Sequence, residues 1–183
     1  MNVFDSHCHL QNAKFDDDRE AVIARAREAG VTAVLSLATR SDDARAVVEI
    51  ANAHEGHYAA VGVHPSDIDD WSPATEALLR ELAKEPRVVV YGEIGLDYYW
   101  KTFEHEHQKR VLREQLAVAR ELRLPVSLHC RDAYDDMVEL LRDENASEIG
   151  GVAHCFAGTE AHARALLDMG FVRDVRRILK LVP

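Results

Sequence analysis

Short apolar runs alternate with longer amphipathic stretches along the whole chain. The apolar runs predict buried strands, and the amphipathic stretches predict helices because their apolar positions recur at helical spacing. The strands are expected at residues 2–7, 31–37, 58–65, 87–95, 125–130 and 150–156. The helices are expected at residues 16–29, 41–54, 72–85, 104–122, 133–144 and 159–169. The pattern therefore predicts six strand–helix units.

The order of these elements indicates the fold class. Strands that are nearly continuous apolar runs, alternating with helices of about 10 or more residues, are typical of a parallel sheet covered on both faces. Ser72 followed by Pro73 is typical of a helix N-terminus, and Gly30 closes the first helix. No linker or sharp change of composition interrupts the pattern, so residues 1–183 are expected to form a single α/β domain.

Composition narrows the class of protein. The chain has 183 residues and is 47% hydrophobic, without a run that approaches the ~18 apolar residues of a membrane span. Its N-terminus lacks the pattern of a secretory leader, which predicts a cytoplasmic protein without a membrane partner. Three cysteines imply no disulfide framework. A net charge of -10 argues against a broad basic surface for nucleic acid, so any phosphate-bearing substrate needs local positive charge.

Polar residues with metal-ligand chemistry recur where the predicted strands end. Because residues two apart on a strand share a face, His7 and His9 can present both imidazoles to one point. The other strand ends carry His64, Glu93, His129 and His154. Ligands and catalytic groups of parallel α/β folds gather at the carboxyl ends of the strands. The recurrence predicts a metal site at this edge.

The donor types narrow the metal and the reaction. Imidazoles with a carboxylate suit Zn, Mn, Fe or Mg, and the two oxygens of Glu93 can bridge two ions. Two ions about 3.5 to 4 Å apart lower the pKa of a bridging water and favour hydrolysis. In the alternative interpretation, Glu93 merely pairs with a histidine, at the desolvation cost of a buried carboxyl.

Five segments together resemble a known family. "FDSHCHL", "GVHPSD", "GEIGLDYY", "LPVSLHCRDA" and "HCFAG" are similar, in order and spacing, to the TatD-type metal-dependent deoxyribonucleases of the amidohydrolase-like superfamily. The resemblance covers about residues 3–171. It implies a TIM-type (β/α)8 barrel, here incomplete with about six to seven β/α units. It also implies hydrolysis of phosphodiester bonds in DNA, commonly from an end, with two divalent ions that are Mg, Mn or Zn.

The resemblance also implies roles for individual residues. His7 and His9 would hold one ion, Glu93 would bridge as the catalytic carboxylate, and His129 and His154 would hold the second ion. By the same resemblance, His64 and Arg131 would contact the substrate phosphate, and Asp97 would support the site or contact the substrate. The expected partner is DNA or an oligonucleotide, bound locally at the metals.

The C-terminal segment departs from the family pattern. Family chains of roughly 250 residues carry an "ETDAP"-like motif whose aspartate completes the first metal site, and this chain turns instead into "VRDVRRILKLVP". Six to seven strands cannot close an eight-stranded barrel, which predicts exposed edges and self-association through them. The tail is expected to form a short amphipathic cover, and Asp174 is not expected to replace the missing aspartate.

Two other functions remain open at the level of sequence. Related amidohydrolases that cleave a small amide, ester or lactone share the histidine pair, although many carry a carbamylated lysine where this chain has Glu93. A truncated, inactive fragment would keep these ligands without a complete site. The aromatic residues Trp71, Tyr98, Tyr99 and Trp100 suit either base stacking or loop packing.

Overall fold

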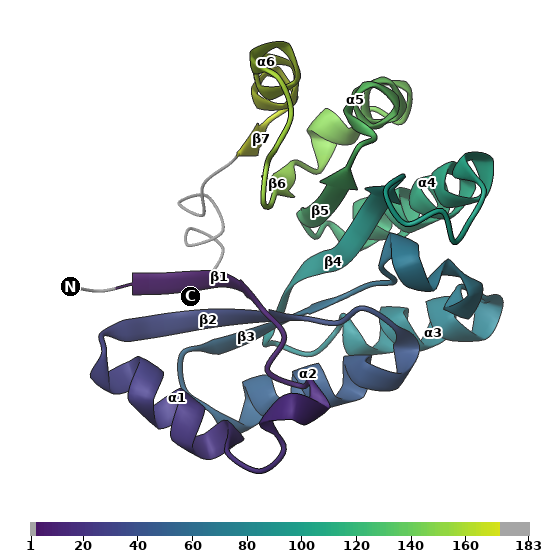
Figure 1. Cartoon of the computed structure of the whole chain (residues 1–183). Helices are drawn as coiled ribbons and strands as arrows, with labels where there is room; N and C mark the ends of the chain where they lie inside the picture. Colours follow the sequence, from purple (N-terminus) through teal and green to yellow (C-terminus); the bar gives the residue numbers. More distant parts are fainter. Residues whose placement is uncertain (1–2, 173–183) are drawn as a thin grey trace.

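A single curved sheet of parallel strands forms the frame of the protein in a computed structural model, which describes residues 3–172 (Figure 1). The seven strands pair in sequence order from β1 to β7. Their bounds are β1 Val3–Cys8, β2 Val31–Leu37, β3 His57–Val61, β4 Val88–Asp97, β5 Val126–Arg131, β6 Gly151–Ala153 and β7 Phe171–Val172. Every pairing is parallel, as the alternating pattern predicts.

Helices connect the strands on the outer side of the curve (Figure 1). Their bounds are α1 Arg19–Glu28, α2 Ser41–Ala53, α3 Pro73–Leu82, α4 His105–Leu122, α5 Tyr134–Asp143 and α6 Glu160–Asp168. Short 3-10 helices, labelled η1 to η3, lie at Ala13–Phe15, Pro65–Asp70 and Ala146–Glu148. The predicted incomplete (β/α) barrel is therefore confirmed. The first helix is shorter than predicted because residues 16–18, which follow η1, form a turn, and α1 begins only at Arg19.

Local signals explain two of the helix boundaries. The Ser72 side chain accepts a hydrogen bond from the backbone N–H of Thr75, and Pro73 occupies the first helical position of α3. Gly30 has a φ of 95°, a left-handed conformation that glycine adopts without steric cost and that ends α1. Both positions behave as the sequence predicts.

Two apolar layers hold the sheet. Residues of one parity along the strands, such as Ala59 and Val61, belong to the large core under the helices. Residues of the other parity, such as Leu35, Leu37 and Ala60, form a second cluster with Val90 and other strand residues. Because successive strand residues point to opposite faces, this alternation shows that the sheet is apolar on both faces.

The two outer strands of the described sheet are β1 and β7. Val3 on β1 is 36% exposed. By contrast, every residue of β3 and β4, in the middle of the sheet, is buried. The predicted open edges are thus confirmed for the described residues, and self-association through them stays a prediction. The amphipathic tail and Asp174 lie outside the described residues. Among those residues, no helix is long and apolar enough to cross a membrane.

Candidate metal centre

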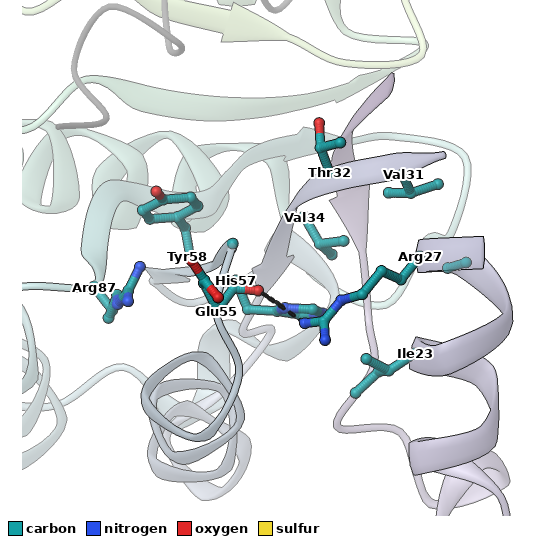
Figure 2. A pocket seen from close by; sticks show the side chains of 11 residues that line it. Ile23, Arg27, Val31, Thr32, Val34, Glu55, His57, Tyr58 and Arg87 are labelled. Carbon is teal, nitrogen blue, oxygen red and sulfur yellow. Dashed lines mark hydrogen bonds between the residues drawn. The ribbon is translucent and has the colours of Figure 1, made fainter. Parts of the chain in front are cut away.

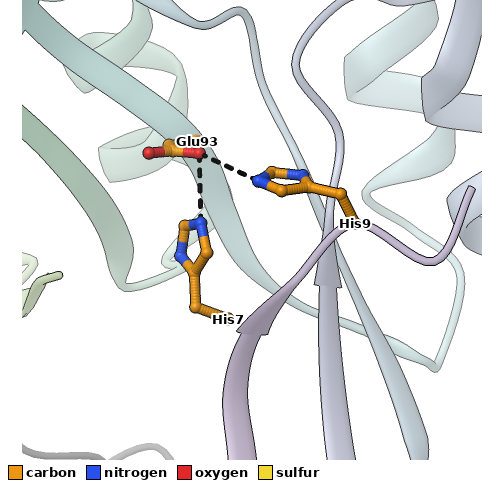
Figure 3. Close-up of side chains that lie close together, drawn as sticks. All are labelled: His7, His9 and Glu93. Atoms are coloured by element: carbon orange, nitrogen blue, oxygen red, sulfur yellow. Dashed lines mark ion pairs between the residues drawn. The ribbon is translucent and has the colours of Figure 1, made fainter. Parts of the chain in front are cut away.

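Glu93 on β4 lies at the centre of a histidine cluster, and only 2% of its surface is exposed. On one side of the carboxylate, the Oε2 atom is 3.3 Å from His7 Nε2 and 3.7 Å from His9 Nε2. Figure 3 shows the two imidazoles converging on this oxygen from the end of β1. His7 and His9 therefore share a target, as their spacing predicts.

The second carboxylate oxygen faces three further histidines. Glu93 Oε1 is 3.2 Å from His129 Nδ1 and 3.8 Å from His64 Nε2, and it also contacts His154 Nε2. Thus the structure brings together all six residues that the strand-end pattern selects. The histidines are divided between the two oxygens of one carboxylate, which is the arrangement a bridging ligand requires.

Two groups within this cluster have the geometry of metal-binding triads. The ligand atoms of His7, His9 and Glu93 lie within 4.8 Å of one another, and so do those of His64, Glu93 and His129. The resemblance assigns His154 to the second group and His64 to the substrate. Distance alone places His64 in this triad instead of His154. The hydrogen bonds of each imidazole show which ring can offer a lone pair to an ion and which offers an N–H to the substrate.

Backbone and carboxylate partners determine which ring nitrogen of two histidines carries the proton. His9 Nδ1 is 2.9 Å from the carbonyl oxygen of Leu37, which can only accept, so Nδ1 donates and Nε2 keeps its lone pair. His129 Nε2 is 2.8 Å from Asp97 Oδ2 and donates to that carboxylate, so the lone pair of the neutral ring is on Nδ1. In both residues the nitrogen that faces Glu93 can bind a metal.

His64 has the opposite arrangement. Its Nδ1 accepts a hydrogen bond of 3.1 Å from the backbone N–H of Ser66, so the proton of the neutral ring is on Nε2. Burial lowers the pKa of His64 to about 4, against the opposing charge of Glu93, and the ring is neutral at pH 7. A neutral His64 therefore presents an N–H donor to the cluster, which suits an anionic oxygen better than a cation.

His7 and His154 have no such constraint. Their rings stack with centroids 3.9 Å apart, and the buried Nδ1 of each has no hydrogen-bond partner among the described residues. Either nitrogen can thus carry the proton, and the Nε2 that faces Glu93 can offer its lone pair. The donor set of imidazole nitrogens around a carboxylate fits a borderline or hard divalent cation.

The Glu93 carboxylate is ionised in this setting. Burial opposes its ionisation, but hydrogen bonds with His129, His154 and His7 outweigh that effect and hold the pKa well below its usual range. Without an ion, the imidazole nitrogens that face this buried anion donate N–H groups to it. When those nitrogens lose their protons, their lone pairs and the carboxylate together form a set of ligands for a cation. The cluster can therefore hold metal ions.

Asp97 and Arg131 end the neighbouring strands β4 and β5, where they are register partners. Asp97 is 2% exposed and orients His129, whereas Arg131 is exposed. The guanidinium of Arg131 lies over the ring of Tyr99 at 3.6 Å from the ring centroid. Asp97 contacts a histidine of the cluster, His129, whereas the described contacts of Arg131 are with aromatic rings and with strand β4.

Two buried glutamines on α4 position the site, and sequence reasoning missed them. Gln108 accepts a hydrogen bond from the N–H of Asp97 and donates to its carbonyl oxygen, at 2.8 and 2.9 Å. Gln115 does the same for Val63, the residue before His64, also at 2.8 and 2.9 Å. The sequence signal for them was that both glutamines, seven residues apart, lie on the same face of the helix as its apolar residues, which predicts that they are buried. A buried amide has to be hydrogen-bonded, and here its partner is a strand end.

A separate cavity of about 510 Å³ lies at the other end of the strands. Figure 2 shows Arg27, His57, Tyr58 and Arg87 around it. Val31 and His57 begin β2 and β3, whereas the histidine cluster follows the strands' carboxyl ends. The cavity is therefore not part of the candidate metal centre.

The fold and the cluster define a partial (β/α) barrel with a candidate metal centre of histidines and a carboxylate at the carboxyl ends of its strands. The sequence model of the family described as TatD related DNase matches residues 4–180. The chain belongs to this family, which confirms the resemblance predicted from the motifs.

Curated relatives agree with this assignment. The chain is 37% identical over 169 residues to YabD of Bacillus subtilis (strain 168), described as an uncharacterized metal-dependent hydrolase, with 92% of this chain covered. It is 39% identical over 187 residues to the 3'-5' ssDNA/RNA exonuclease TatD of Pantoea sp. (strain At-9b), with 98% of this chain covered.

Solved structures show the same fold. YjjV, a TatD homologue from Escherichia coli K12, matches 92% of this chain with a TM-score of 0.86 and 32% identity. A TatD family hydrolase from Entamoeba histolytica matches the whole chain with a TM-score of 0.84 at 22% identity, which supports the fold alone. The chain spans about two thirds of the length of these relatives: 66% of YabD, 72% of the Pantoea exonuclease and 65% of YjjV.

Proposed function

We propose that this chain is a metal-dependent phosphodiesterase that acts on the ends of single-stranded DNA or RNA. His7, His9 and Glu93 would hold one divalent ion, and Glu93, His129 and His154 would hold a second, each ion being Mg, Mn or Zn. The observation that carries the proposal is the division of these histidines between the two oxygens of Glu93. The substrate class comes from relatives described as ssDNA/RNA exonucleases.

The proposed ions would supply a water of lowered pKa and stabilise the attacking and leaving oxygens of the displacement. The protein's part is to hold their ligands in place. Asp97 keeps the proton of His129 on Nε2, and the Leu37 carbonyl does the same for Nδ1 of His9. Partners of this kind fix the ring orientation and raise the basicity of the ligating nitrogen.

Two residues are proposed to bind the substrate phosphate. His64 directs a neutral N–H donor at the Glu93 side of the cluster, where a phosphate oxygen can accept it. Arg131 offers a guanidinium fork, which matches the oxygens of a phosphate. These local donors provide positive potential on a chain whose net charge is -10.

Glu93→Ala is the direct test of the proposed function. We expect at least about 100-fold slower release of nucleotides from a single-stranded oligonucleotide, together with loss of bound metal by elemental analysis, because both sites lose their shared anion. Glu148→Ala is the matched control, since the Glu148 side chain is 66% exposed and forms a surface ion pair with Arg120. Wild-type turnover with metals bound in Glu93→Ala would refute the role proposed for Glu93.

A further inference from the structure

Two adjacent aromatic side chains stand out on the surface beside the metal centre. Tyr99 is 50% exposed and Trp100 is 56% exposed, and they are the only aromatic residues among the large exposed hydrophobics of the described chain. Burying such rings is favourable, so an exposed pair needs an explanation in terms of binding.

The rest of the aromatic group is used for packing. The Tyr98 hydroxyl donates to Asp136 at 2.7 Å, and the Tyr98 ring stacks on His105 with centroids 3.5 Å apart. Trp71 donates its indole N–H to Glu114 and packs against the core. The structure thus divides the aromatic residues between loop packing, for Tyr98 and Trp71, and exposure, for Tyr99 and Trp100.

The exposed pair is held in a defined geometry. The rings of Tyr99 and Trp100 meet edge to face, with centroids 4.8 Å apart and planes at 89°. The guanidinium of Arg131 lies over Tyr99 at 3.6 Å and 5.8 Å from the centroid of Trp100. We name Tyr99, Trp100 and Arg131 the aromatic platform. Aromatic faces and guanidinium planes are the groups on which unpaired bases stack.

One carboxylate connects the platform to the metal centre. Asp97 Oδ1 accepts hydrogen bonds from the backbone N–H groups of Tyr99 and Trp100 at 3.0 and 3.2 Å, while Oδ2 accepts from His129. Trp100 lies three residues after Asp97, a step that spans at most about 10 Å, the length of about three stacked nucleotides. The platform is therefore within reach of bases next to a phosphate at the metal centre.

A lysine follows on the same loop. Lys101 lines a hollow of about 470 Å³ together with Glu104, His105 and His107, among other residues. Lysine beside a stacking surface is the combination that tracks the backbone of a single strand. On an acidic protein, this local combination favours a nucleic acid over an apolar peptide.

We propose that the aromatic platform is a subsite that binds an unpaired nucleobase, within about three nucleotides of the phosphodiester bond to be cleaved. This inference rests on the proposed function for its substrate, and it adds the residues that recognise the base. Stacking requires an accessible base face, so the subsite selects unpaired over duplex ends. It reads no sequence, because every base has such a face.

The test compares oligonucleotides with and without bases. Phosphorothioate-linked oligonucleotides, which resist cleavage, are titrated onto the whole protein as isolated, and binding is followed by fluorescence anisotropy. One has thymine throughout, and the other has abasic sites at its last three positions. Both oligonucleotides are made once with deoxyribose and once with ribose, which shows whether the protein binds DNA, RNA or both. A preference for the base-containing oligonucleotide with either sugar supports the proposal.

We expect the wild-type protein to prefer the base-containing oligonucleotide by about 5- to 150-fold, the range for one stacked base. Trp100→Ala should reduce this preference toward unity, and Trp100→Phe should retain part of it. Leu167→Ala is the matched control, because Leu167 is an equally exposed apolar side chain (48%) on the distant helix α6. A base preference that survives in Trp100→Ala, or that the wild-type protein lacks, would overturn the proposal.

Hydrolysis of bis(4-nitrophenyl) phosphate by the wild-type protein separates this inference from the proposed function. This small diester carries no base. Hydrolysis without a base preference overturns the platform and keeps the phosphodiesterase. A base preference without hydrolysis of the diester or of oligonucleotides supports the platform and overturns the phosphodiesterase.

Discussion

Replacing Gln115 by methionine tests whether α4 holds the strand end that carries His64. The side chain of Gln115 is buried, with 1% exposure, and makes both of its hydrogen bonds to the backbone of Val63. Methionine has nearly the same length and fills the same space but can neither donate to a carbonyl nor accept from an N–H. The substitution therefore removes two hydrogen bonds and leaves the packing almost unchanged.

The magnitude follows from the groups left without partners. The N–H and C=O of Val63 each lose a buried partner, at a cost of about 1–3 kcal/mol per group. Burying a thioether in place of an amide offsets about 1–3 kcal/mol of this cost. We expect Gln115→Met to lower the free energy of unfolding by about 2 kcal/mol, a large part of the stability of an ordinary domain.

Urea unfolding followed by circular dichroism measures this change. The midpoint should fall while the m-value stays constant, because the surface exposed on unfolding does not change. Amide hydrogen exchange should localise the effect, with the Val63 N–H exchanging about 30-fold faster, the factor that corresponds to about 2 kcal/mol. Arg110→Met is the control on the same helix, since the Arg110 side chain is 62% exposed and its ion pair with Glu114 contributes less than about 0.5 kcal/mol.

The result that would refute this reasoning is a loss of stability no greater than that of Arg110→Met. In that case, water or a shifted backbone would satisfy Val63, and the glutamine would not be what holds this strand end. Unchanged exchange at Val63, together with a general loss of stability, would also contradict the assigned role.

Two further predictions concern the metal ligands and the cysteines. Asp97→Asn should weaken metal binding by about 10- to 100-fold, because an amide donor facing Nε2 of His129 moves the ring proton to Nδ1; calorimetric titration that gives wild-type affinity would contradict this. Cys155 should be alkylated first at about pH 8 because it is exposed, whereas burial raises the pKa of Cys8 to about 11 and that of Cys130 to about 12, so that both thiols stay protonated. Mass spectrometry that finds two or three labels at the rate of the first would refute it.

Local sequence was sufficient to predict the frame and the side chains that gather around Glu93. Strand and helix positions follow from the period of apolar residues, and those patterns were correct within a few residues for all six helices. Parallel strands bring their carboxyl ends to one edge, so five histidines at four strand ends had to converge on Glu93 at a fifth. The family motifs then supplied roles that spacing alone does not determine.

Tertiary structure decided what depends on contacts between distant segments. The Leu37 carbonyl and the Asp97 carboxylate determine which nitrogen of His9 and His129 faces Glu93, and neither contact is encoded near the histidine in the chain. Likewise, only the packing of α4 against the sheet brings Gln108 to Asp97 and Gln115 to Val63. Tyr98 and Tyr99 are neighbours of the same type, yet one packs and the other is exposed. Hydrogen bonds and burial are set by the final packing, whereas periodicity is a property of the chain itself.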